Sequence, residues 1–299
     1  MSSYLEASAR ERMAQVLDAG SFMEFLSPSQ RVVSPHLAQL DVPVSFDDGV
    51  LVGRGTLQGT KVFAAAQEGG FMGGAVGEVH GAKLVGMLQR AITEQASAVL
   101  LLLETGGVRL HEANAGLIAV SEVMRAVLDV RAAGIPVIVL IGGANGCFGG
   151  MGIVARCANA IVMSEEGRLA MSGPEVIETA SGVEEFDSRD RALVWRTTGG
   201  KHRYLLGDCQ TIVADDIAAF ADAAVMALQS CREGDVPLSL DAMMAEHTLL
   251  ATRVRDYGAM RDPLDIWRQL GMPDPEAVPL LEAPAFLRMA ACHRAEVQR

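Results

Sequence analysis

Short apolar runs alternate with segments of helical periodicity through the middle of the chain. Residues 99–104 and Val137–Ile141 are apolar on both faces, as strands buried in a parallel sheet are. Between them, apolar side chains recur at the spacing of one helix face, at Leu117, Val120, Met124, Val127 and Leu128. Strands that alternate with helices predict an α/β fold with a parallel sheet and helical crossovers.

The same patterns predict the flanking elements. Strands are expected at Val50–Leu57 and residues 61–66, paired through a turn at Gly59, and at residues 160–163 and 168–171. Helices are expected over residues 1–20, from the glycine-rich turn 69–74 to about Gln95, over residues 151–157, after Gly173-Pro174 and from about Ala214. In the last of these, Ile217, Phe220, Ala224 and Leu228 form one stripe.

Prolines separate the two ends of the chain from this central pattern. Residues 21–48 read as a loop interrupted by Pro28, Pro35 and Pro43, and residues 231–283 mix short helices with prolines. We therefore expect an N-terminal helix and loop extension (1–47), one α/β domain (48–230) and a C-terminal helical extension (231–299). The last part would pack on the core or on a partner.

Composition narrows the classes of function. The chain has 37 acidic and 25 basic residues, a net charge of −12, which argues against nucleic-acid and anionic-membrane surfaces. The N-terminal residues lack the apolar region of a signal peptide, and no apolar run reaches the length of a membrane span. Five cysteines without a CxxC pair favour free thiols in a reducing compartment. We expect a cytoplasmic protein.

Two glycine pairs follow two of the predicted buried strands. Gly106-Gly107 and Gly149-Gly150 each precede a helix. Glycine lets a ligand approach the backbone, and the start of a helix leaves N–H groups without intrahelical acceptors. Such turns on neighbouring strands can direct two N–H groups at one oxygen and form an oxyanion hole. The candidate donors are Gly107 or Val108 on one turn and Gly150 or Met151 on the other, with Gly106 and Gly149 against the substrate. The alternative is a pair of tight turns that bind nothing.

The absence of several known motifs excludes several kinds of site. The run 142–152 contains neither GxGxxG nor GxxxxGK[ST], and GxSxG is absent, which excludes dinucleotide, P-loop and serine-nucleophile sites. His111-Glu112 begins HEANA rather than HExxH, so no metal site is expected.

Two groups of charged residues have two interpretations each. Arg109, His111 and Glu112 follow the first glycine turn and could hold a substrate carboxylate or move a proton, or serve only in capping and surface pairing. Lys201-His202-Arg203 is the densest basic spot of the chain. Lys201 and Arg203 could bind a phosphate of a thioester carrier, or the segment could be a solvated loop.

These motifs, in this order, resemble those of biotin-dependent carboxyltransferase β-type subunits, which belong to the crotonase superfamily. Residues 104–112 are similar to the Ser-Gly-Gly-Ala-Arg-x-x-Glu signature of that family, with Val108 at the Ala position. A backbone donor does not depend on that side chain. Residues 71–77 and 81–83, Gly149-Gly150, 160–163 and 173–178 complete a resemblance that covers roughly residues 48–230.

Departures from that family narrow the resemblance. The chain lacks the four-cysteine zinc ribbon of bacterial acetyl-CoA carboxylase β subunits and has one domain where propionyl-type enzymes have two. Through residues 105–117 and 197–204 it resembles the β subunits of malonate decarboxylases.

The resemblance implies a crotonase-like spiral of ββα units in a single carboxyltransferase-type domain. It also implies a hetero-oligomer with a γ subunit, and an acyl-carrier subunit that presents malonyl thioester on a CoA-like prosthetic arm. No cofactor is then bound covalently by this chain. Loss of CO₂ from a malonyl thioester leaves an enolate, which convergent N–H donors stabilise without a metal. The acid that protonates the enolate is assigned to neither chain.

Alternatives of other classes stay open. A carboxyltransferase that exchanges CO₂ with biotin would use the same enolate, and a non-catalytic subunit would only scaffold its partner. A crotonase-type hydratase is disfavoured because the sequence shows no well-placed pair of catalytic glutamates.

Overall fold

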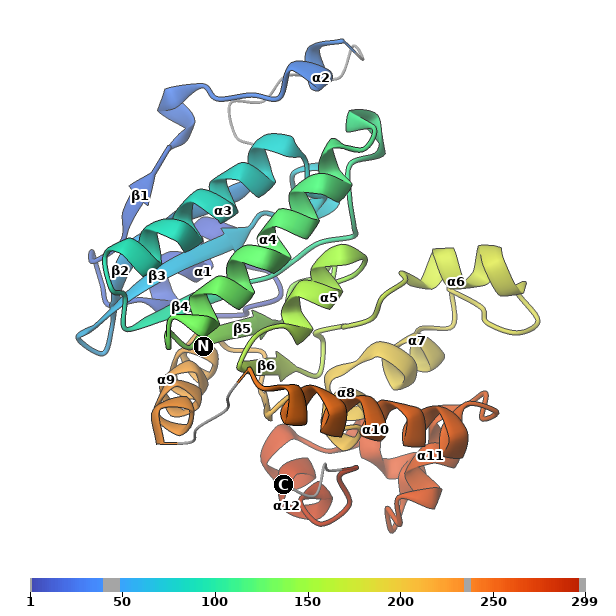
Figure 1. Cartoon of the computed structure of the whole chain (residues 1–299). Coiled ribbons are helices and arrows are strands. Elements are labelled where there is room, and N and C mark those ends of the chain that lie inside the picture. Colours follow the sequence, from blue (N-terminus) through green and yellow to red (C-terminus); the bar gives the residue numbers. More distant parts are fainter. Residues whose placement is uncertain (1, 40–48, 234–237, 296–299) are drawn as a thin grey trace.

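The computed structural model describes residues 2–39, 49–233 and 238–295 of the chain. Its centre is a seven-stranded sheet in which the strands follow one another in space as they do along the chain (Figure 1). The strands are β1 (Met23–Phe25), β2 (Val50–Leu57), β3 (Thr60–Gln67), β4 (Ala98–Leu102), β5 (Val137–Ile141), β6 (Ala160–Ser164) and β7 (Thr211–Val213). The first three pair antiparallel, and β3 to β7 pair parallel. The predicted parallel sheet with helical crossovers is confirmed.

Helices cover both faces of the sheet (Figure 1). One face packs against α3 (Glu78–Thr93), α4 (Ala115–Ala132) and α5 (Gly150–Arg156), and the other against α1 (Ala9–Val16) and α9 (Ile217–Glu233). Within β4, Val99 and Leu101 belong to the first core and Leu100 and Leu102 to the second. This double burial explains why the strand is apolar without alternation.

The remaining helices lie in the connections between strands or, for the last three, after β7. They are α2 (Pro35–Ala38), α6 (Pro174–Ser181), α7 (Arg191–Thr198), α8 (Gly200–Leu205), α10 (Leu240–Tyr257), α11 (Pro263–Gln269) and α12 (Ala283–Ala290), with 3₁₀ turns η1 (Pro28–Gln30), η2 (Met72–Gly74), η3 (Leu110–Glu112) and η4 (Pro275–Leu280). Trp267 and Phe286 of the C-terminal part are buried in the same core as β5, so this part packs on the domain. The boundary expected after residue 230 falls inside α9.

Several local predictions were wrong. Residues 168–171 make single bridges to Cys147 and Gly199 instead of a strand, because they cross the ends of the strands rather than run beside one. The helix expected over residues 1–20 is confined to α1, which a capping box of Ser8 and Glu11 starts. The loop expected at 21–48 contains β1 and α2, while Pro43 lies outside the described residues. β7 was not expected.

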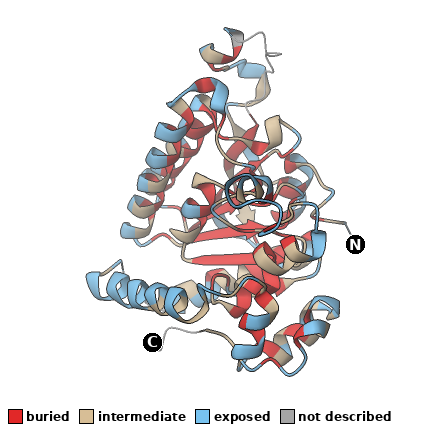
Figure 2. Ribbon diagram, turned by 90° about the vertical axis from the view of Figure 1, so that its right-hand side faces the viewer, coloured by how far each residue is buried: buried red, intermediate tan, exposed pale blue. Residues whose placement is uncertain are grey.

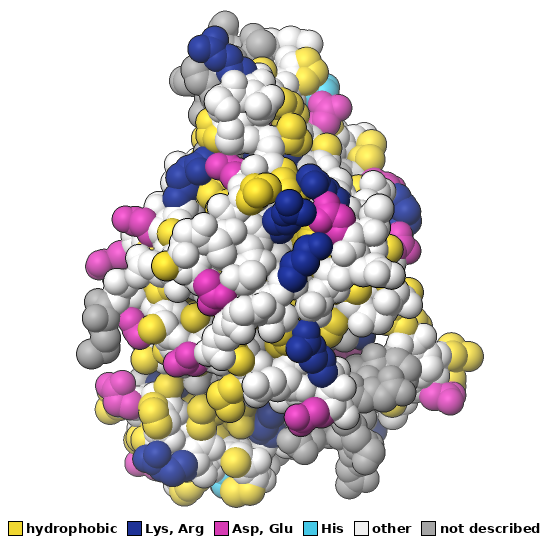
Figure 3. Space-filling model, turned by 90° about the vertical axis from the view of Figure 1, so that its left-hand side faces the viewer, with side chains coloured by type: hydrophobic (Ala, Val, Ile, Leu, Met, Phe, Trp, Pro, Cys, Tyr) yellow, Lys and Arg dark blue, Asp and Glu magenta, His cyan; other side chains and the backbone are white. Residues whose placement is uncertain are grey.

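The open edge of the sheet at β1 carries paired charges. Glu24 of β1 contacts Arg10 of α1 at 2.9 Å, and on the neighbouring strand β2 Arg54 contacts Glu94 at 2.8 Å. Figure 3 shows several basic side chains one above another on this side of the molecule, with acidic side chains beside them. Charged side chains on an edge discourage pairing with another strand.

None of the helices that the structure describes is long and apolar enough to cross a membrane. The five cysteines, all in the described ranges, are free thiols, as expected.

Candidate active site

The two glycine turns lie side by side at the carboxyl ends of β4 and β5. Parallel pairing continues beyond these strands, because the Thr105 N–H donates to the Gly146 carbonyl (2.8 Å) and the Phe148 N–H to the Thr105 carbonyl (2.9 Å). A Cβ added to Gly149 would lie 3.1 Å from the Cα of Gly107. The turns are therefore in contact, which is the condition that the oxyanion hypothesis requires.

Gly149 needs to be glycine for two reasons. Its backbone has φ 65° and ψ −146°, a region open to glycine and costly for other residues. A Cβ at this position would also press on the Cα of Gly107, which would have to move by a few tenths of an ångström. The Gly149 N–H donates to the Met171 carbonyl at 2.9 Å, which holds the turn just before α5 begins.

Hydrogen bonds decide which N–H groups are available on the first turn. The Gly106 N–H donates to the Gly73 carbonyl (2.8 Å), and the Gly107 N–H donates to Thr105 Oγ1 (3.1 Å). The Val108 N–H has no acceptor among the described residues. Of the two donors proposed for this turn, the structure therefore favours Val108.

The second turn leaves two N–H groups available. Gly150 and Met151 open α5, where backbone N–H groups precede the first intrahelical acceptors. Neither donates to an acceptor within the described part of the chain. The N–H groups of Gly150 and Met151 therefore both remain candidate oxyanion donors.

Thr105 is a site residue that the sequence analysis missed. Its hydroxyl accepts from the Gly107 N–H and donates to the Gly107 carbonyl, both at 3.1 Å. These bonds fix the peptide that presents Val108. The sequence could have pointed to Thr105, because the family signature also has a residue with a hydroxyl group, serine, at this position.

Arg109 does not lie open to a substrate carboxylate, which corrects its predicted role. Its side chain is fully buried, contacts Glu112 at 3.2 Å and donates through Nε to the Ala75 carbonyl at 2.8 Å. Glu112 in turn accepts from the Glu78 N–H at 2.6 Å, at the start of α3. The pair fastens the glycine-rich segment before α3 to the first turn. His111 is exposed in η3, and its role stays a prediction.

The basic segment 201–203 is neither a phosphate clamp nor a loop. It forms α8, in which Lys201 is 3 % exposed and donates to the Pro279 carbonyl at 3.0 Å. Arg203 contacts Asp208 at 3.2 Å. His202 Nδ1 accepts from Trp267 Nε1 at 3.1 Å. Both predictions for this segment were wrong, because the C-terminal helices cover it.

Burial shifts two pKa values around α8. Burial, together with the Arg203 guanidinium, lowers the pKa of His202 to about 3, so the ring stays neutral and can accept from Trp267. Burial also raises the pKa of Glu165 to about 7, although Lys201 Nζ, at 3.6 Å from its carboxylate, opposes this. These groups belong to the packing of the C-terminal part.

A buried polar network lies next to the glycine turns and supports them. Arg12 of α1 contacts the Glu104 carboxylate, which also accepts from the backbone N–H (3.1 Å) and side-chain amide (3.2 Å) of Asn145. A Cβ at Gly143 would collide with the Glu104 carboxylate. The sequence could have indicated this network, because Arg12 lies on the otherwise apolar face of α1 formed by Ala9, Met13 and Val16.

The rim of the turns is apolar and open. Leu110 is 83 % exposed and Met171 is 73 % exposed, and Leu117, Ile118 and Val176 are exposed on α4 and α6. Figure 2 shows exposed residues on the elements at this end of the sheet. Because exposed apolar side chains of this extent mark interaction sites, the site is built to be covered.

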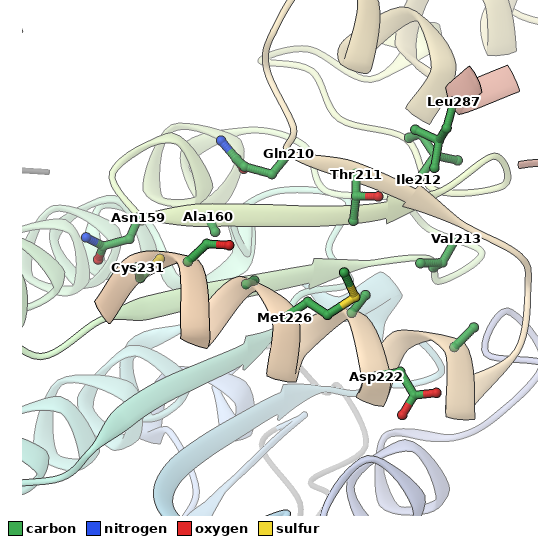
Figure 4. Close-up of a pocket in the computed structure, with 14 residues that line it drawn as sticks. Asn159, Ala160, Gln210, Thr211, Ile212, Val213, Asp222, Met226, Cys231 and Leu287 are labelled. Carbon is green, nitrogen blue, oxygen red and sulfur yellow. The ribbon is translucent and has the colours of Figure 1, made fainter. Parts of the chain in front are cut away.

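A cavity of about 700 Å³ lies elsewhere, between β7, α9 and α12. Figure 4 shows Met226 of α9 pointing towards the strand on the side of Thr211 and Val213, whereas Ile212 points to the other side, towards Leu287 of α12. None of the glycine-turn residues lines it. We place the chemistry at the glycine turns, where unpaired donors lie, and not in this cavity.

The chain is also similar to known proteins. Residues 6–226, most of the chain, match the carboxyl transferase domain. The chain belongs to the carboxyl transferase family.

Its relatives narrow the family further. The chain is 41 % identical to the malonyl-S-ACP:biotin-protein carboxyltransferase MADC of Malonomonas rubra, over 96 % of this chain and 95 % of the relative. A chain of the Pseudomonas malonate decarboxylase hetero-tetramer in complex with malonate is 39 % identical, with a TM-score of 0.79, and the match covers 88 % of this chain and 94 % of that one. The Pseudomonas malonate decarboxylase MdcD-MdcE hetero-dimer matches at 37 % identity and a TM-score of 0.66, over 85 % and 97 % of the two chains. The crotonase-like carboxyltransferase fold and the resemblance to malonate decarboxylase subunits are confirmed.

Proposed function

We propose that this chain is the β subunit of a malonate decarboxylase. With a γ-subunit partner it would remove CO₂ from malonyl thioester on an acyl-carrier subunit, as a carbon–carbon lyase. The observation that carries the proposal is the contact between Gly107 and Gly149, with the N–H groups of Val108, Gly150 and Met151 left unpaired beside it. The relatives named above supply the substrate class.

The chemistry follows from these donors. Cleavage of the bond between the α-carbon and the carboxylate releases CO₂ and sends the bonding electrons to the thioester oxygen as an enolate. N–H donors from both turns bind that oxygen more strongly as the negative charge develops, which lowers the barrier. A proton delivered to the α-carbon then completes the acetyl thioester. The donors on this chain stabilise the enolate, and the proton comes from a group outside the two turns.

The open apolar rim supports a partner subunit. Leu110 and Met171 flank the two turns and are exposed. Covering them would exclude water from the donors and strengthen their interaction with the enolate. The solved Pseudomonas relatives are a hetero-dimer and a hetero-tetramer, which fits a γ subunit on this rim.

We further propose that this chain binds no cofactor covalently and that the carrier's CoA-like arm brings the thioester to the turns. A cytoplasmic location fits the five free thiols.

Transfer of the carboxyl group to biotin is the second candidate. The Malonomonas relative, which the chain matches over nearly its whole length, is named a carboxyltransferase to a biotin protein. The enolate and its donors would be the same. Only the destination of CO₂ differs.

An assay of the complex separates these functions. The chain is co-expressed with its partner and supplied with malonyl-CoA as the probe, and CO₂ and acetyl-CoA are measured. Equal amounts of both products, unaffected by avidin, would support decarboxylation. Turnover that requires a biotinylated protein and stops with avidin would support transfer. A folded complex that yields neither product would refute both.

A further inference from the structure

Helix α10 exposes its apolar side to solvent. Leu240 is 72 % exposed and Val254 is 73 % exposed, at the two ends of the stripe. The stripe recurs at the spacing of one helix face and consists of Leu240, Met243, Met244, Leu250 and Val254. None of the residues of α10, all of which the structure describes, is buried. In Figure 2, α10 is the long, mostly pale-blue helix that stands away from the core at the lower left.

The opposite side of α10 attaches the helix through charges. Arg253 contacts Asp208 at 2.8 Å, and Glu246 contacts Arg156 at 3.0 Å. A surface helix of a globular protein normally turns its apolar stripe to the core and its charges to water. In α10 the apolar stripe faces water, whereas the attached side carries the two charge contacts and Tyr257, which packs partly buried against the core. The polar attachment holds the helix in place while the apolar stripe stays uncovered, which marks a docking surface.

The polar flank of the stripe complements itself. Asp241, Thr248 and Arg255 lie along one edge at intervals of seven residues, and all three are exposed. In an antiparallel pair of α10 helices centred on Thr248, Asp241 of each copy lies opposite Arg255 of the other. Opposite charges along such a flank select partner and orientation in helix pairs. Arg255 contacts Asp256 within its own helix at 2.7 Å, but an exposed pair of this kind contributes little and can be exchanged.

We propose that α10 is a self-association element that pairs antiparallel with α10 of a second copy of this chain. The pair covers the apolar stripes and adds two Asp241–Arg255 contacts across the interface. Specific interfaces bury about 1,200–2,000 Å², and a single pair of helices of this length is at the small end of that range. We therefore expect a dimer whose population depends on concentration. This inference is independent of the proposed catalytic function.

Sedimentation velocity of the full chain, from low to high micromolar concentration, tests the proposal. The wild-type chain should shift from monomer to dimer, and Leu250→Asp should weaken the dimer at least tenfold because it buries a charge in the stripe. Leu250 is exposed, so the variant should fold. Ala245→Asp adds the same charge at an exposed position off the stripe and should leave dimerisation unchanged. A wild-type chain that stays monomeric throughout would overturn the proposal.

Charge exchange tests the orientation. Asp241→Arg alone places like charges opposite one another and should weaken the dimer, and Arg255→Asp alone should do the same. The double variant should restore the wild-type dimer. A double variant that is weaker than either single one would rule out the antiparallel pair.

The complex with the partner subunit provides the third measurement. Leu250→Asp should leave the hetero-complex and its turnover intact and remove only the association between complexes. If Leu250→Asp instead separates the two different subunits, the partner subunit covers α10 and the proposal fails. Malonyl-CoA turnover by the remaining complex then still reports on the proposed function separately.

Discussion

The glycine turns and the basic segment of α8 make an instructive comparison. Both stood out in the sequence as places where an anionic ligand could bind. The turns carry no charged side chain at 106–108 and 149–151, yet they leave three N–H groups without acceptors in the described structure. In α8, Lys201 and Arg203 are charged, but both already contact protein acceptors. A binding site is recognised by unsatisfied donors in an open place, and charge alone does not reveal it.

The largest expected effect lies at Gly149. Gly149→Ala adds a Cβ at a positive φ and at 3.1 Å from Gly107, which forces the two turns apart. Loss of one oxyanion donor typically costs about 100–1,000-fold in kcat, and we expect a loss of at least that size. The measurement is steady-state turnover of malonyl-CoA by the complex.

The control for this change is Gly86→Ala. Gly86 lies inside α3, and a Cβ there meets nothing within 4 Å. Alanine should therefore keep turnover and stabilise the fold by about 0.5–1 kcal/mol. If Gly149→Ala retained wild-type kcat, the turns would lose their assigned role and the contrast with α8 would disappear.

A smaller effect is expected for Lys201→Met, in free energy of unfolding rather than in substrate binding. The change leaves the Pro279 carbonyl without its donor, and the loss of such a bond to a charged group costs about 1–3 kcal/mol. Urea unfolding measures the stability, and KM for malonyl-CoA measures binding. Exposed Arg189→Met serves as the matched loss of one positive charge. A rise in KM with unchanged stability would show that Lys201 of α8 contributes to substrate binding, as a phosphate site would.

The smallest effect is a pH dependence that originates at His202. The folded chain keeps this ring neutral down to about pH 3, whereas the unfolded chain takes up the proton near pH 6.5. The unfolded state therefore binds more protons between these values, and stability falls as pH drops below 6.5. The His202 contribution should be about 1–2 kcal/mol between pH 7 and pH 5.

Urea midpoints of the wild-type chain and His202→Gln at both pH values isolate this contribution. Glu165 changes stability in the opposite direction over part of this range, but it is common to both proteins and cancels in the difference. Equal pH slopes for the two proteins would show that His202 is not held neutral by burial.

Local patterns predicted the main elements well. Val137–Ile141 could be predicted because burial on two faces leaves an unbroken apolar run, and the 78–93 helix because one buried stripe leaves a helical period. β7 was missed because three residues are too few to show a period. α8 was missed because its charges are buried by α11, η4 and α12, which lie more than sixty residues further along the chain.

The candidate site also has features that the sequence predicts and features that only the folded structure determines. The glycine pairs and their place after buried strands follow from sequence alone, because neighbouring parallel strands end at one edge of the sheet. The choice of Val108 over Gly107 required three-dimensional hydrogen bonds, since the Thr105 hydroxyl occupies one N–H and leaves the other free. The burial of Arg109 and Lys201 was likewise decided by packing.

The residues alone specified an α/β chain with two glycine turns after adjacent strands, because strand and helix periods and the conformational needs of glycine are local properties. Which N–H groups stay unpaired, which charges are buried and which helix turns its apolar side outward depend on partners distant in the chain. Those contacts exist only after the chain folds, so tertiary structure alone decides them.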